Sequence, residues 1–92
     1  MMDLHELRKR IDGIDESLVA LFVQRMDVSA EIAHYKQRHD LPLHDPDREK
    51  QKLRDLSGKV TKDRESYVIA LYSLIFELSL NEQERILNPE VN

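Results

Sequence analysis

Residues 18–32, LVALFVQRMDVSAEI, decide the fold of this 92-residue chain. Their apolar side chains recur at spacings of three and four, which is typical of a helix that packs along another helix. Arg25 stands where the next apolar residue of this series belongs. A guanidinium on a packed helix face is destabilising unless an anion or a polar group pairs with it. The segment therefore predicts a long helix and raises the question of what Arg25 binds.

The same spacing continues on both sides of this segment. The series runs without a skip through Leu4, Leu7, Ile11, Ile14, Leu18, Leu21, Arg25, Val28, Ile32 and Tyr35. It stops before the loop HDLPLHDP, whose two prolines disfavour a continuing helix. We expect a first helix over about residues 3–38, which would be about 54 Å long at about 1.5 Å per residue.

A second helix is expected over about residues 46–57. Asp45 is a favoured N-cap, Pro46 suits the first helical position, and Gly58 marks the end.

A third helix is expected over about residues 63–87, with Thr61 or Asp63 as its cap and Asn88-Pro89 as its stop. The chain is rich in Leu, Glu, Lys and Arg and has only two glycines and three prolines, which favours helices over a sheet. We predict one all-α domain of three helices spanning residues 1–92.

The first helix is too long for a compact chain of this size. A compact domain of about 92 residues has a radius of gyration near ~12 Å, or a diameter of about 32 Å. The helix would project from the domain, and its apolar side chains would be exposed to solvent. We expect an intertwined helical homodimer in which a second copy covers that series.

Composition narrows the class of function. The formal net charge of −4 argues against a nucleic-acid surface, and no apolar run reaches membrane-spanning length. Cysteine is absent, which suits the cytoplasm and removes thiol chemistry. The four histidines match no zinc spacing, so we expect no metal site. The start, MMDLHELRKR, has no apolar stretch typical of a signal peptide.

Polar side chains interrupt or flank the apolar face of every predicted helix. They are Arg8, Arg25, Lys36, Arg48, Glu49, Ser79 and Gln83. Singly, each fits a structural role, because a long cationic side chain can reach solvent and one arginine can set helix register. Together they carry a surplus of positive charge, which favours a small ligand with more than one carboxylate. Phosphate is disfavoured because no glycine-rich loop is present.

Four stretches carry a family resemblance: LRKRIDGID, LFVQRMDVSAEIAHYK, HDPDRE and SLIFELSLNEQ. From Leu4 to about Leu87 the chain resembles the all-helical, AroQ-class chorismate mutases. The resemblance implies an intertwined homodimer with two active sites. It also implies conversion of chorismate to prephenate, on the way to phenylalanine and tyrosine, without a cofactor or covalent intermediate.

The resemblance also implies roles for the catalytic residues. Lys36 and Gln83 would donate to the ether oxygen of chorismate from two sides, and Lys36 would also bind a carboxylate of the substrate. Glu49 would accept from the ring hydroxyl, helped by the backbone near Asp45. Because position 83 is a glutamine and some relatives carry a glutamate there, activity should not collapse between neutral and mildly alkaline pH.

Four further residues would bind the substrate's carboxylates. Arg25, with Ser79 nearby, would bind the ring carboxylate of chorismate. Arg48 would be a second cation near that carboxylate. Arg8 would reach from one chain into the partner's site to hold the enolpyruvyl carboxylate.

Two other functions are left open at this stage. Isochorismate-pyruvate lyase shares the fold and much of the cationic site, although Glu49 favours the mutase. A helical dimerisation or regulatory module without turnover is the alternative of another class. We expect a stand-alone enzyme, but a piece of a fused enzyme is left open, as is a partner enzyme of the aromatic pathway.

Overall fold

The computed structural model describes residues 3–89. Within this range the chain has three α-helices and a short 3-10 helix, with no strand. The helices are α1 (Leu4–Arg38), α2 (Pro46–Ser57), η1 (Lys62–Arg64) and α3 (Glu65–Leu87). The predicted all-α class with three helices is therefore confirmed.

Local capping chemistry starts the first two helices. Asp3 precedes α1, and its side chain accepts a hydrogen bond from the backbone N–H of Glu6 at 2.9 Å. Asp45 precedes α2 and accepts from the backbone N–H of Arg48 at 3.1 Å, with Pro46 as the first helical residue. Each cap satisfies a backbone donor that the first helical turn leaves free.

The start of α3 differs from the prediction, which placed Thr61 or Asp63 as its cap. Thr61 instead precedes η1, and its carbonyl accepts from the N–H of Arg64 at 2.9 Å. Asp63 lies inside η1, and Arg64 precedes α3 without a side-chain capping bond. The prediction was wrong because a 3-10 turn occupies the approach to α3 and satisfies local backbone groups itself.

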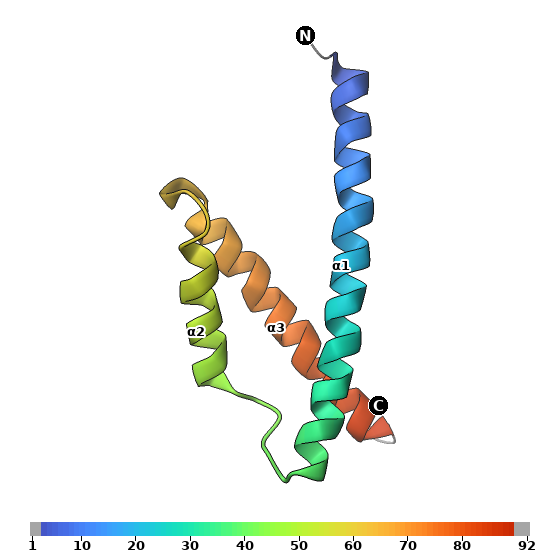
Figure 1. Ribbon diagram of the computed structural model, residues 1–92, viewed down its shortest axis with the longest axis vertical. Coiled ribbons are helices and arrows are strands. Elements are labelled where there is room, and N and C mark those ends of the chain that lie inside the picture. Colours follow the sequence, from blue (N-terminus) through green and yellow to red (C-terminus); the bar gives the residue numbers. More distant parts are fainter. Residues whose placement is uncertain (1–2, 90–92) are drawn as a thin grey trace.

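The three helices form an open, elongated arrangement (Figure 1). The helices α2 and α3 lie next to each other as a hairpin, and α3 crosses the C-terminal half of α1. The N-terminal end of α1 projects beyond both (Figure 1). The radius of gyration is 16.7 Å, well above the ~12 Å of a compact chain of this size, and the longest extent is 56 Å.

The face of α1 that packs on α3 lies beside the predicted apolar series. Ser29 and Ala33 of α1 and Ser79 and Gln83 of α3 are the buried residues of these helices. The small side chains of Ser29, Ala33 and Ser79 allow the two helices to approach closely where they cross.

The apolar series itself stays exposed within one chain. From Leu4 to Leu21 its six members keep between 43% and 61% of their surface exposed. No described helix is both long enough and apolar enough to cross a membrane.

Candidate active site

A cavity of about 320 Å³ opens where the three helices approach one another. Its wall combines charged, polar and apolar side chains: Arg25, Val28, Ser29, Ile32, Lys36, Leu43, Asp45, Arg48, Glu49, Lys52, Phe76, Ser79, Leu80 and Gln83. The volume lies in the range that small-molecule sites usually occupy.

Arg25 lies at the crossing of α1 and α3. Its Nη1 donates to the hydroxyl oxygen of Ser79 at 3.0 Å. The guanidinium carbon lies 5.8 Å from the ring centre of Tyr72 and 5.6 Å from that of Phe76. These partners orient the guanidinium without neutralising it. The positive charge stays available to a ligand.

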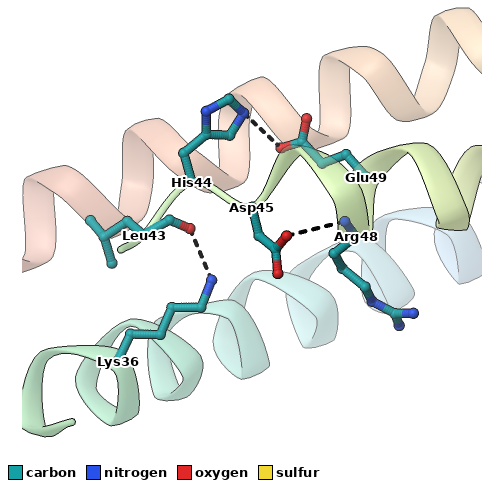
Figure 2. A network of polar contacts seen from close by, with 6 residues as sticks. All are labelled: Lys36, Leu43, His44, Asp45, Arg48 and Glu49. Atoms are coloured by element: carbon teal, nitrogen blue, oxygen red, sulfur yellow. Dashed lines mark hydrogen bonds and ion pairs between the residues drawn. The ribbon is translucent and has the colours of Figure 1, made fainter. Parts of the chain in front are cut away.

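Lys36 connects the last turns of α1 to the loop before α2. Its Nζ donates to the carbonyl oxygen of Leu43 at 2.9 Å (Figure 2). A lysine ammonium has three donor hydrogens, so two remain for other acceptors. The contact holds the ammonium at the cavity wall.

The N-cap and first turn of α2 supply three charged residues to the cavity: Asp45, Arg48 and Glu49. Glu49 lies with one carboxylate oxygen 3.5 Å from Nε2 of His44, which is an ion pair only when that histidine is protonated (Figure 2). The Arg48 side chain donates to Gln51 at 3.4 Å.

The cavity wall carries more positive than negative charge. Its four cations are Arg25, Lys36, Arg48 and Lys52, against two carboxylates, Asp45 and Glu49. Across residues 3–89, none of these four cations forms an ion pair, and the hydrogen bonds found for three of them go to neutral oxygens. A surplus of two unpaired positive charges in a small cavity is suited to a dianion.

Gln83 lies in the wall with only 7% of its surface exposed. Its Nε2 donates to the backbone oxygen of Ser29 at 2.9 Å and to the Ser29 hydroxyl at 3.0 Å. The nitrogen end of this amide therefore lies against α1.

The structure brings together seven of the eight predicted site residues. All except Arg8 line the cavity. Arg8 is exposed and lies 17 residues before Arg25 on the same helix, about 25 Å away at ~1.5 Å per residue. The roles predicted for these residues remain predictions.

Sequence reasoning missed two polar residues of the wall, Ser29 and Lys52. Both had a signal in the helical spacing. Ser29 lies four residues after Arg25 and seven before Lys36, and Lys52 lies three residues after Glu49. In the part of the chain that the structure describes, no three potential metal-ligating side chains gather into a cluster.

Comparison with known proteins identifies related sequences. A family described as chorismate mutase type II matches residues 7–84. A bifunctional chorismate mutase/prephenate dehydratase of Buchnera aphidicola is 34% identical over 92 residues, which cover 98% of this chain and 24% of that protein. The chain thus spans about a quarter of the length of this bifunctional relative.

Two relatives are closer to the chain in length. A chorismate mutase of Methanocaldococcus jannaschii is 29% identical over 92 residues, covering 97% of this chain and 92% of that protein. A 4-amino-4-deoxychorismate mutase of Streptomyces venezuelae is 28% identical over 91 residues, covering 96% and 87%. No solved structure matches the chain.

Proposed function

The chain belongs to the type II chorismate mutase family, and we propose that it converts chorismate to prephenate in the cavity between its three helices. This reaction leads toward phenylalanine and tyrosine. It is an intramolecular rearrangement in which a carbon–oxygen bond breaks while a carbon–carbon bond forms, so it requires neither a nucleophile nor a proton carrier.

The unpaired positive charge of the cavity is the observation that carries this proposal. Chorismate is a dianion with two carboxylates, and the wall offers a surplus of two positive charges held by neutral partners. A non-catalytic module has no need to keep Arg25 and Lys36 unpaired at a cavity, because unpaired charges that are partly removed from water are destabilising.

Binding of the two carboxylates supplies orientation. Arg25 and Ser79 would hold the ring carboxylate, with Arg48 adding positive charge nearby. Glu49 would accept from the ring hydroxyl beside the backbone of Asp45. Holding a flexible substrate so that its reacting ends meet removes part of the entropic barrier.

Lys36 and Gln83 would act on the reacting atoms. Negative charge grows on the ether oxygen as its bond to the ring breaks, and fixed donors stabilise this charge more in the transition state than in the substrate. Lys36 has donor hydrogens to spare. Gln83 lies in the same wall and contributes an amide donor that does not titrate.

We further propose that the functional unit is a homodimer. The exposed apolar series from Leu4 to Leu21 is spaced by three and four residues and so forms one stripe along the N-terminal part of α1. Burying it against a second copy would also place Arg8, which is remote from its own cavity, at the partner's site.

The test is to incubate purified protein with chorismate, follow the loss of diene absorbance and identify the product by chromatography. Prephenate is expected, and Gln83→Ala should lower the rate at least tenfold because it removes one transition-state donor. Gln37→Ala, an exposed glutamine of α1, is the matched control and should leave the rate unchanged.

A folded wild type that leaves chorismate untouched would refute the mutase. Release of pyruvate from isochorismate by that protein would then indicate the lyase. Thermal stabilisation by a dicarboxylate mimic of the transition state would argue against a purely structural module.

A further inference from the structure

Ser29 is the residue to which the amide of Gln83 is bound. One serine supplies both acceptors, its hydroxyl at 3.0 Å and its backbone oxygen at 2.9 Å from Nε2. The two residues come from α1 and α3 and are 6% and 7% exposed. Both also line the cavity, so their contact borders the space where a ligand would lie.

The two oxygens of Ser29 determine which end of the amide lies against α1. A backbone carbonyl can only accept, whereas a hydroxyl can accept or donate. Turning the amide around would place Oε1 of Gln83 next to the Ser29 carbonyl, and two acceptor oxygens at hydrogen-bond distance repel each other. The observed arrangement, with nitrogen toward α1, satisfies both oxygens.

We propose that Ser29 is a positioning residue for Gln83, and this inference rests on the proposed mutase function. Nε2 carries two hydrogens. With substrate bound, one hydrogen is shared between the two oxygens of Ser29, and the other points to the ether oxygen of the substrate. An anchored donor needs little reorganisation as charge develops on that oxygen, which is the condition for strong transition-state stabilisation.

The serine hydroxyl matters because the carbonyl alone holds the amide poorly. The Ser29 carbonyl lies inside α1 and also serves the backbone hydrogen bonding of that helix. Without the hydroxyl, the amide has one shared acceptor and space to rotate. Rotation would point Oε1, an acceptor, at the developing negative charge.

The first test compares wild type with Ser29→Ala, Gln83→Ala and the double variant. Ser29→Ala should lower kcat two- to tenfold, the effect of losing one ordinary hydrogen bond, and change KM less than twofold. In the Gln83→Ala background the same substitution should have no further effect on kcat. Ser73→Ala, an exposed serine of α3, is the control.

The second test measures how the activity of Gln83→Glu depends on pH, with and without Ser29→Ala. If Ser29 had only a structural role, the two pH profiles would coincide. Gln83→Glu must be protonated to donate to the ether oxygen, so its activity should fall as pH rises. The Ser29 hydroxyl can donate to the ionised carboxylate and favour that form. Adding Ser29→Ala should therefore move the loss of activity to higher pH by about half to one unit.

The outcomes separate the two proposals. A wild type without chorismate turnover overturns both. An active wild type whose kcat is unchanged or raised by Ser29→Ala overturns the positioning role alone. The same conclusion follows if Ser29→Ala acts equally in both backgrounds, or if the two pH profiles coincide. Thermal denaturation of each variant checks that the helices remain folded.

Discussion

Replacing Arg25 by methionine separates a ligand-binding arginine from a register-setting one. Methionine keeps the unbranched stem of the side chain but ends before the guanidinium, and it removes the charge and all five donors. In the structure Arg25 donates to Ser79 and lies over the rings of Tyr72 and Phe76, and no carboxylate of residues 3–89 pairs with it. Its removal therefore leaves no buried charge without a partner.

The change in stability should be small. The lost hydrogen bond to Ser79 contributes about 1 kcal/mol, and each aromatic contact contributes about 0.5–1 kcal/mol. Against this, a partly desolvated and unpaired guanidinium is replaced by an apolar side chain, which is favourable by a similar amount. The free energy of unfolding should stay within about 1 kcal/mol of the wild-type value.

The change in activity should be large. A hydrogen bond to a charged group is worth about 1.5–3 kcal/mol, and a guanidinium can offer two of them to one carboxylate. Losing about 3 kcal/mol or more lowers kcat/KM by roughly 10²-fold or more.

Two assays check this prediction on the same preparations: chorismate turnover, and chemical denaturation at a fixed protein concentration. Arg38→Met, an exposed arginine of α1, is the matched control. A fall in kcat/KM of less than tenfold would refute a carboxylate-binding role. Loss of several kcal/mol of stability with normal turnover would instead show that Arg25 sets helix register.

Four further outcomes are expected. Lys36→Met should lower kcat/KM by about 10²–10³ and also raise KM, because we propose that the ammonium binds a substrate carboxylate as well as the ether oxygen; a change in only one of kcat and KM, measured by steady-state kinetics, would contradict this. Leu18→Glu, on the exposed stripe of α1, should halve the mass measured by light scattering and abolish turnover, and an unchanged mass would contradict the dimer. Wild-type kcat should stay level between about pH 7 and 9, since Gln83 does not titrate, and a steep decline would count against its role. On the outer side of α3, the bond from Arg85 holds the pKa of Glu82 below its usual range. Arg85→Gln should raise that pKa in an NMR titration, and any stability from the pair should be present above the ordinary glutamate pKa and disappear as pH falls through the lowered one.

The three helices and most of their ends could be predicted from the sequence, because they depend on residues that are neighbours along the chain. Asp45 and Pro46 start α2 by satisfying or removing N–H groups within one turn. The wrong prediction for the start of α3 also concerned neighbouring residues, because a threonine such as Thr61 can precede either an α-helix or a 3-10 turn. The backbone bond from Arg64 to Thr61 belongs to the turn, and the side-chain preferences alone did not reveal it.

The site was predictable where a polar residue interrupts an apolar face. Arg25 and Lys36 stand out because a charge there requires a partner, and both line the cavity. Ser29 gave a weaker signal, because a serine on a helix face is common and its importance comes from Gln83, 54 residues away. Partners across such a separation depend on the crossing of α1 and α3.

The sequence alone determined three helices, a first helix too long for a compact chain, and a set of cations without matching carboxylates. Each of these follows from spacing along one helix, which 3.6-residue periodicity makes readable. Only the tertiary structure decided that α3 crosses α1 at Ser29 and Ala33, beside the apolar series and not on it. The position of this crossing depends on how closely the surfaces of α1 and α3 can approach each other. It is therefore a property of the two helices together and cannot be read from either helix alone.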